Sequence, residues 1–358
     1  MAKNRIWLAV VAVALVLLTA CGEGTAEQET AARATADSSH ELKTATVPPA
    51  ETATVERATA TAAFPTATAT PSPAATASAT ALPATSEPTA TAATMARAGT
   101  RTLIVNHETL AAFDEMPAEA IAAASELRLL FRHASVGHNI DNGLNCLQNT
   151  FEQRPNSCDR GLASDEILYD SVFDRSKWTF EFHSPPPGQN PGWWNKVNFF
   201  VERVNNLAPE EQYDVISFKL GYVDGLDDSY IAEAFFAETW QGDTPTITDI
   251  EALQAAHPDR QLVLWTMGLA RIVGTANSAS FNEQMRAYVL EHGGVLLDIA
   301  DIESHNPDGN LCTHDGFPAL CPEYTEEARG GHLNARGSQR LAKAVWILMA
   351  MLAGWDGP

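Results

Sequence analysis

The stretch LRLLFRHASVGHNIDNGL, residues 127–144, decides the fold class. Its first seven residues form an apolar run of strand length, and the residues from Gly137 onward have the spacing of an amphipathic helix. Ser135 falls in the short turn between them. A buried strand that passes into a helix in this way is the repeating unit of α/β domains with parallel sheets.

The same alternation continues along the chain. Further apolar runs of strand length lie at residues 178–183, 214–222, 262–268 and 294–300. A short helical lead is expected around residues 117–125, and later helices are expected to begin near Gly137, Trp193, Ser229, Thr246, Asn277 and Asn334. Near-continuous apolar strands indicate a sheet covered on both faces. We therefore predict an α/β domain: a doubly wound three-layer α/β/α sandwich with a mainly parallel five-stranded sheet.

Two side chains with complementary chemistry are expected at one edge of this sheet. Ligand sites in open α/β sheets lie outside the carboxyl ends of the strands. Ser135 follows the first strand and precedes a helix N-terminus, whose amides and dipole stabilise an oxyanion. His332 lies in a glycine-rich loop before the final helix and offers the base that a serine nucleophile needs. The alternatives are a helix-capping serine and a capping or solvent-facing histidine.

The order of these motifs resembles the SGNH, or GDSL-like, hydrolases across residues 126–353. The resemblance rests on the serine after the first strand, the segment DVISFKLGYVD at 214–224, and a His-x-Asn-x-x-Gly segment that begins at His332. It implies a flavodoxin-like fold of SGNH-hydrolase type and an esterase that works through an acyl-enzyme, with Ser135 as nucleophile and His332 as base. We expect no cofactor. Gly192 would match the oxyanion-hole glycine of the family.

The sequence departs from the family pattern at the oxyanion position. The third block of the family usually reads Gly-x-Asn-Asp, and here Val223 occupies the asparagine position after Gly221. Valine has no donor, and loss of one oxyanion donor costs about 100- to 1000-fold in rate. Asn139, Asn195 or a backbone amide would have to fill the position, and we include Gly221 among the oxyanion or substrate-binding candidates.

The acid that orients the histidine also departs from the pattern. The family places an aspartate three residues before the histidine, where this sequence has Arg329, and the first block has Ala134 where aspartate is common. The orienting acid must then come from elsewhere. The candidates are Glu326, Glu327, Asp315 and Asp301. We select Asp301, because it follows the fifth strand and so belongs to the same sheet edge.

Other side chains are of types that bind metal ions or sugars. The possible metal ligands are His133, His138, His183, His305, His314, Asp298, Asp301 and Asp315. They lack a recognisable ligand spacing, so we expect no metal and keep a metal-dependent phosphoesterase as a weaker alternative. Trp193 and Trp194 offer broad apolar faces, which would either stack on a sugar or pack at the rim of the core.

The N-terminus predicts export. Lys3 and Arg5 precede an apolar run at residues 6–18, which is shorter than the roughly 20 residues of a membrane-spanning helix. The run ends in Leu-Thr-Ala before Cys21, a sequence that resembles the lipobox of bacterial lipoproteins. Residues 1–20 are therefore expected to be a signal peptide, and Cys21 is expected to carry lipid that anchors the chain outside the cytoplasm. An ordinary secreted protein is the alternative.

Residues 21–101 differ in composition from the rest of the chain. They are rich in Thr, Ala, Pro, Ser and Glu, cannot bury a core, and are predicted to form a disordered tether before a domain at 102–358. In an exported chain, the close pairs Cys146 with Cys158 and Cys312 with Cys321 indicate disulfides. A zinc site is the alternative, although neither pair has the two-residue spacing of a structural zinc site.

The charge of the chain limits its partners. The formal net charge of −22 argues against nucleic acid and against a basic membrane-binding patch. We expect a monomer that meets the membrane only through its lipid. The predicted function is a cell-surface serine esterase acting on a small extracellular ester or an acylated polysaccharide. The alternative is an inactive surface protein that keeps the fold and binds glycan or cell-wall polymer.

Overall fold

A computed structural model describes residues 102–148, 158, 172–183, 189–273 and 275–358. The predicted signal peptide at 1–20, the lipidated Cys21 and the tether at 21–101 lie outside the described residues and stay predictions. Among the helices of the described segments, none is both long and apolar enough to cross a membrane.

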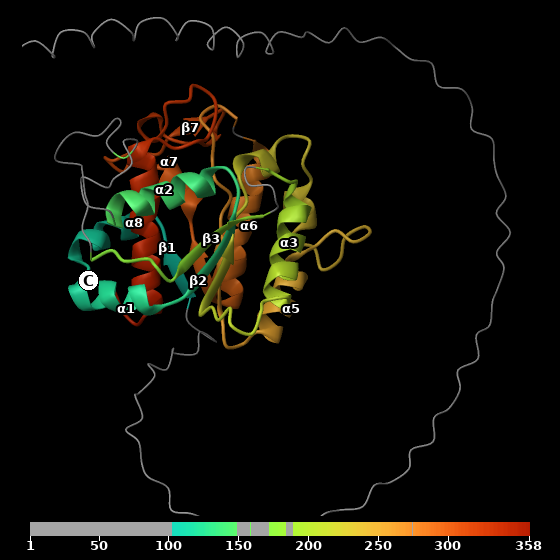
Figure 1. Cartoon of the computed structure of the whole chain (residues 1–358). Helices are drawn as coiled ribbons and strands as arrows, with labels where there is room; N and C mark the ends of the chain where they lie inside the picture. The colour runs from blue at the N-terminus through green and yellow to red at the C-terminus, as the bar shows by residue number, and fades with distance from the viewer. Residues whose placement is uncertain (1–101, 149–157, 159–171, 184–188, 274) are drawn as a thin grey trace, which may run out of the picture. The chain divides into compact units, whose positions relative to one another are not determined.

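A parallel sheet forms the centre of the domain (Figure 1). Its strands are β1 (Thr102–Val105), β2 (Leu129–His133), β3 (Trp178–Phe182), β4 (Val215–Phe218), β5 (Gln261–Trp265) and β6 (Gly294–Leu297). Their order is β1-β6-β5-β4-β2-β3, and every neighbouring pair is parallel. The five predicted strands are β2 to β6, in the flavodoxin-like order. The predicted strand number is wrong by one, because β1 adds a sixth strand beside β6.

Helices cover both faces of the sheet, which confirms the predicted three layers (Figure 1). One layer holds α1 (Ala118–Glu126), α2 (Val136–Gln148) and α8 (Ala335–Leu352). The other holds α3 (Trp193–Asn205), α5 (Ile247–Ala256) and α6 (Ala276–His292). Short helices α4 (Ile231–Ala234) and α7 (Ile299–Ser304) lie within the connections after β4 and β6.

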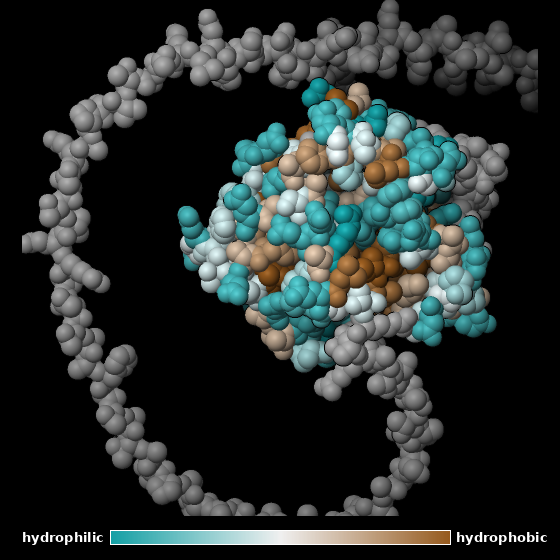
Figure 2. Space-filling model, turned by 180° about the vertical axis from the view of Figure 1, so that it is seen from behind, coloured by the Kyte–Doolittle hydropathy of each residue, from teal (hydrophilic) through white to brown (hydrophobic). Residues whose placement is uncertain are grey.

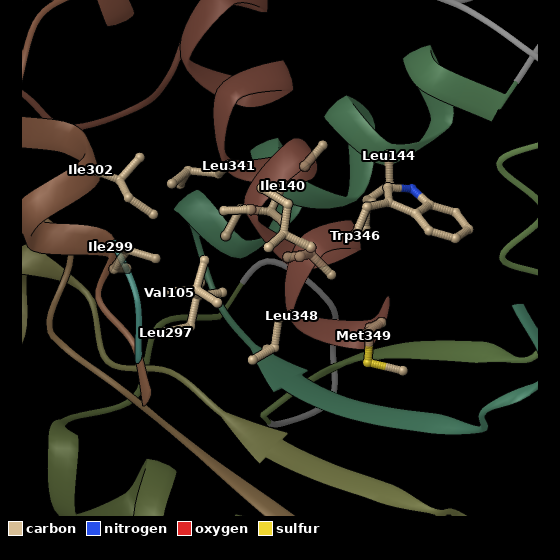
Figure 3. Close-up of a cluster of buried hydrophobic side chains, with 14 of the residues drawn as sticks. Val105, Ile140, Leu144, Leu297, Ile299, Ile302, Leu341, Trp346, Leu348 and Met349 are labelled. Carbon is tan, nitrogen blue, oxygen red and sulfur yellow. The ribbon is translucent and has the colours of Figure 1, made fainter. Parts of the chain in front are cut away.

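The core consists of two apolar clusters, one on each side of the sheet. In the first, Val105 and Leu297 of the sheet, Ile140 of α2 and Trp346 of α8 belong to one packed group (Figure 3). All five residues of β2 are buried, as expected for a central strand covered on both faces. Figure 2 shows the molecule from behind the view of Figure 1. On this face, hydrophilic residues cover most of the rim, and hydrophobic residues gather near the centre.

Both predicted disulfides are present. Cys146 bonds Cys158 with Cα atoms 5.5 Å apart, and Cys312 bonds Cys321 with Cα atoms 5.4 Å apart. The second bridge closes a loop that contains the two-stranded hairpin β7 (Thr313–His314) and β8 (Phe317–Pro318). These cysteines are therefore cross-links rather than zinc ligands.

Candidate active site

Ser135 occupies a tight turn between β2 and α2. The strand order reverses at β2, which lies between β3 and β4, and such a switch point is where ligands bind in open α/β sheets. The backbone of Ser135 has a φ of 50°, a left-handed conformation that is uncommon outside glycine. A Cβ on Gly137 would lie 2.3 Å from the Cβ of His133, so α2 can begin this close to the strand only with glycine there. The turn presents the serine at the carboxyl edge of the sheet.

His332 and a carboxylate complete a hydrogen-bonded chain with this serine. The Oγ atom of Ser135 lies 2.8 Å from Nε2 of His332, and Nδ1 of His332 lies 2.8 Å from Oε1 of Glu327. The His332 backbone amide also donates to Oε2 of Glu327, at 3.2 Å. The side chains of His332 and Glu327 are 50% and 40% exposed, so a substrate and water can reach them. A hydroxyl, an imidazole and an acid in this order have the geometry of a nucleophile, its base and the group that orients the base.

The prediction that Asp301 orients His332 is wrong. Asp301 instead accepts a hydrogen bond from the backbone amide of His107 at 2.9 Å, and its carboxylate lies 2.5 Å from Nδ1 of the same residue. Asp301 belongs to α7, at the β6 end of the sheet, whereas Ser135 follows β2. Glu327 lies where Asp301 was expected, because the loop after the Cys312–Cys321 bridge folds back beneath the histidine.

The other two acids considered for this position do not bond His332. Asp315 lies in the β7–β8 turn with an exposed side chain, 3.4 Å from Nε2 of His314. Glu326 lines a cavity beside His332. Of the four acids considered, Glu327 is thus the one that the structure places against the imidazole.

Close backbone contacts hold the His332 loop in place. A Cβ on Gly330 would lie 1.7 Å from Oε2 of Glu327, and a Cβ on Gly331 would lie 2.5 Å from the carbonyl oxygen of Leu269. Glycine at 331 is therefore needed for the loop to pass this close to the Leu269 backbone, and a side chain at 330 would displace the Glu327 carboxylate. The Thr325 hydroxyl donates to the carbonyl of His332 at 2.5 Å. Together these contacts fix the backbone from which the imidazole projects.

Asn139 joins this loop to α2. Its Oδ1 accepts a hydrogen bond from the backbone amide of Leu333 at 3.2 Å. Asn139 lies one helical turn after Ser135, so the contact connects the serine helix to the residue that follows His332. The Asn139 side chain therefore uses its carbonyl oxygen to position the His332 loop. An oxyanion donor would instead use the amide nitrogen.

Two candidate oxyanion donors are backbone amides that have no acceptor in the described part of the chain. Among the described residues, no hydrogen-bond acceptor takes the amide proton of Ser135 or that of Gly192, the N-cap of α3. Gly221 differs, because its amide donates to Oδ2 of Asp224 at 2.7 Å and so is already occupied. Gly221, one of the oxyanion or substrate-binding candidates, therefore has no free amide to offer an oxyanion. Asn195 lies in the first turn of α3, and its side chain makes no hydrogen bond within the described segments.

A layer of buried charge lies below these loops. Nζ of Lys196 lies 2.5 Å from Oδ2 of Asp224, with both side chains almost fully buried. Lys219 and Glu303 are also buried. Burial lowers the pKa of Lys219 to about 8, a change to which the Lys196 charge adds, and burial raises the pKa of Glu303 to about 8. Loss of hydration disfavours the charged form in each case.

Two histidines at the strand ends are buried and neutral. Burial, with the charge of Lys219 as the next cause, lowers the pKa of His133 to about 3. Burial likewise lowers the pKa of His183 well below its usual value, and its Nε2 lies 3.2 Å from the carbonyl oxygen of Lys219. Their exclusion from solvent makes them part of the floor of the site rather than metal ligands open to solvent.

A cavity of about 260 Å³ adjoins the histidine and the acid. Its polar lining includes Asn139, Asn142, Glu326, Glu327, His332 and Ser338. Ser135 is not part of the lining. The cavity has room for a few water molecules beside the base.

The residues that could hold a metal lie elsewhere. His107, Asp301 and His305 bring their ligand atoms within 4.8 Å of one another, and the two imidazole rings stack at 3.6 Å. This cluster is at the β1 and β6 end of the sheet. The other histidines and aspartates considered from sequence do not assemble with it: Asp298, for example, binds Arg286 at 2.8 Å.

Comparisons with known proteins give only distant likenesses. No family model and no curated protein matches the sequence. A solved structure from Bacteroides fragilis, described as a "putative acylhydrolase", is 15% identical over 64% of this chain and 88% of its own, with a TM-score of 0.35. A "putative lipolytic protein of G-D-S-L family" from Desulfitobacterium hafniense is 9% identical over 62% of this chain and 99% of its own, with a TM-score of 0.32. Because these TM-scores are low, the chemistry must be argued from the geometry of the site.

Three residues that make notable contacts in the structure were difficult to identify from the sequence: Glu327, Lys196 and His107. Glu327 was one of four possible acids, and only the neighbouring Gly330 and Gly331 hinted at a tight loop around it. Lys196 was missed, although it is a lone lysine beside apolar Val197 on the buried side of α3. His107 was missed because the short strand before it was not predicted.

Proposed function

We propose that the domain is a serine ester hydrolase of SGNH type. The observation that carries the proposal is the chain of contacts from Ser135 through His332 to Glu327, with both links at 2.8 Å. A serine hydroxyl is a weak nucleophile by itself and needs a base within hydrogen-bonding distance. The left-handed backbone of Ser135 supports the same interpretation, because strained turns at sheet edges present nucleophiles in hydrolases.

The proposed reaction has two halves. The Oγ atom of Ser135 attacks the ester carbonyl carbon while Nε2 of His332 takes the hydroxyl proton, and Glu327 holds the imidazole in the required tautomer. The amides of Ser135 and Gly192 donate to the oxyanion. Collapse of the intermediate breaks the ester C–O bond, and His332 returns the proton to the departing alcohol. Water then attacks the acyl-enzyme by the same route and releases the acid.

The proposed substrate is an acylated polysaccharide or another small extracellular ester. The N-terminal signal, the lipid on Cys21 and the long tether would place the domain outside the cytoplasm, anchored to the membrane. An exposed aromatic surface supports a sugar. Trp194 is 41% exposed, and its indole lies 3.3 Å from the position of a Cβ on Gly192. Tyr230 is also exposed and contacts Trp193 ring to edge. Indole and phenol faces stack well on sugar rings.

The test is turnover of an activated acetyl ester together with labelling by a fluorophosphonate. Wild type is expected to do both, and Ser135→Ala is expected to lose labelling and at least about 10⁴-fold of kcat. Ser280→Ala is the matched control, because Ser280 lies exposed on α6 and should leave both readouts unchanged. Wild type without turnover and labelling would refute the proposal, and an active Ser135→Ala would refute this nucleophile.

A non-catalytic glycan-binding protein is the second candidate. The observation that favours it is Val223, which cannot supply the donor that the family takes from asparagine at this position. Retention on an acylated polysaccharide without release of free acid, by both wild type and Ser135→Ala, would support this candidate against the esterase.

A further inference from the structure

We propose that Lys196 and Asp224 are positioning residues, which together hold the amide of Gly192 at a fixed place relative to Ser135. The proposal rests on the proposed esterase function, in which the Gly192 amide donates to the oxyanion. It adds a role for a buried ion pair that touches neither substrate nor base.

The contacts of the pair join two loops at the carboxyl edge of the sheet. Nζ of Lys196 lies 2.5 Å from Oδ2 of Asp224, and the same oxygen accepts the amide proton of Gly221 at 2.7 Å. On the other side, the backbone amide of Lys196 donates to the carbonyl of Gly192 at 3.2 Å, within the first turn of α3. Gly192 is thereby linked through one side chain to the loop that follows β4.

That loop is a suitable fixed point for the serine. Strand β4 is hydrogen-bonded to β2, the strand that leads into Ser135. Lys219, at the end of β4, donates its backbone amide to the carbonyl of Arg132 at 3.2 Å, and Arg132 is three residues before the serine. The distance between the two oxyanion amides therefore depends on β2, β4 and the Lys196–Asp224 pair.

Stability alone is a poor reason for this pair. The Lys196 and Asp224 side chains are 2% and 1% exposed, so both charges have lost nearly all their hydration. Replacing such a pair by neutral groups of similar size is often neutral or stabilising. Burial lowers the pKa of Lys196, while the Asp224 carboxylate opposes that change through its charge and hydrogen bond. What an ion pair adds over an apolar contact is a fixed geometry.

The position of an oxyanion donor directly affects the rate of ester hydrolysis. An oxyanion donor works when it lies about 2.7–3.1 Å from the developing charge, and misplacement by about 1 Å costs on the order of 100-fold. Val223 removes the side-chain donor of the family, so the proposed site relies more heavily on its backbone amides. A displaced α3 N-terminus would then leave the oxyanion with the Ser135 amide alone.

The test uses the full chain with the double substitution Lys196→Met and Asp224→Asn. This variant keeps the side-chain sizes close and leaves no unpaired buried charge, so it is expected to fold. We expect kcat for an activated acetyl ester to fall about 100-fold, KM to change less than about 3-fold, and fluorophosphonate labelling to slow by the same factor as kcat. A merely structural role would not produce this split between kcat and KM in folded protein.

The control is the double substitution Arg128→Met and Asp214→Asn. Arg128 and Asp214 form an ion pair with a 2.8 Å contact between the residues that precede β2 and β4, at the opposite end of the same two strands. Because this pair is partly exposed, we expect only a small loss of thermal stability, and an unchanged kcat at a temperature where both variants are folded.

Three outcomes are decisive. Wild-type kcat and labelling rate in the Lys196→Met/Asp224→Asn variant would overturn the positioning role while leaving the proposed function intact. An equal loss of kcat in the control would also overturn it, because the effect would then follow from a weakened sheet. Wild type without turnover or labelling would instead refute the esterase, and the positioning role with it.

Discussion

Two imidazole–carboxylate pairs lie at the same carboxyl edge of the sheet, and they differ in what they contact. His332 is 2.8 Å from Glu327, and its other ring nitrogen meets the hydroxyl of Ser135. His107 is 2.5 Å from Asp301, and its ring stacks on His305. A histidine beside an acid is therefore insufficient to mark a nucleophilic site, since both regions contain one.

The difference between the regions arises from the backbone before each pair. The turn after β2 holds Ser135 in a left-handed conformation above a glycine that packs directly on the strand. The turn after β1 leads through His107 into a 3-10 helix, Glu108–Glu115, and within the described part of the chain no hydroxyl hydrogen-bonds this imidazole. Strain at a defined position, rather than the presence of titratable groups, distinguishes the candidate nucleophile.

The largest expected effect separates the two acids. Glu327→Gln should lower kcat by about 10³- to 10⁴-fold, because a neutral amide holds the imidazole in the wrong tautomer and cannot stabilise its cation. Asp301→Asn is the matched substitution in the other pair and should leave kcat within about twofold. Steady-state hydrolysis of an activated acetyl ester measures both. A larger loss for Asp301→Asn than for Glu327→Gln would reverse the roles given to the two regions.

The fold was largely predictable because its signal is local. Each of the five predicted strands is an apolar run. Strands β2, β3 and β5 lead into the long covering helices α2, α3 and α6, whereas β4 and β6 lead first into the short helices α4 and α7. Strand β1 escaped prediction because it has only four residues, Thr102–Val105, and directly follows a low-complexity segment. Its pairing with β6 depends on residues almost two hundred positions away, which no local pattern encodes.

The candidate site was predictable in part. Ser135 and His332 were identifiable because each occupies a motif at a strand end or helix start. The choice of Glu327 over Asp301 was not, because it depends on how a loop folds back through Gly330 and Gly331. The occupied amide of Gly221 depends likewise on the side-chain direction of Asp224, which the sequence pattern does not specify.

A smaller effect is expected on the stability of the domain at low pH, through His133, two residues before the candidate nucleophile. Burial lowers the pKa of His133 to about 3, so the folded protein keeps this histidine neutral while the unfolded chain takes up a proton below its ordinary pKa of 6.5. The stabilisation is therefore complete above pH 6.5 and is lost as the pH falls toward 3. For one such group the free energy of unfolding should fall by about 2.5 kcal/mol between pH 6 and pH 4.

Hydrogen exchange as a function of pH tests whether the two regions respond differently. Peptides from α2, which packs on His133 through Gly137, should lose protection at a higher pH than peptides from α7. His133→Phe removes the titrating group within an aromatic surrounding that includes Phe131 and Phe182, and should flatten the pH dependence of unfolding. An unchanged pH dependence in that variant would assign the acid sensitivity to another group.

The smallest expected effect comes from the cross-link beside the second pair. The Cys312–Cys321 bridge spans 9 residues, and the chain enters it directly after α7, where the backbone amide of Cys312 donates to Ser304 at 2.7 Å. Replacing both cysteines by alanine should lower the free energy of unfolding by about 2 kcal/mol, because a short loop restricts the unfolded chain only modestly. Chemical denaturation measures this loss.

Activity should be nearly unaffected by the same change, since the His332 loop has its own supports. Thr325 holds the His332 carbonyl, and Asn139 of α2 holds Leu333, the next residue along the chain; neither of these residues lies within the bridged loop. We therefore expect kcat of Cys312→Ala/Cys321→Ala to stay within about twofold of wild type at a temperature where the variant is folded. A loss comparable with that of Glu327→Gln would mean that the bridge, rather than these hydrogen bonds, sets the position of the imidazole, and that the two regions act as one site.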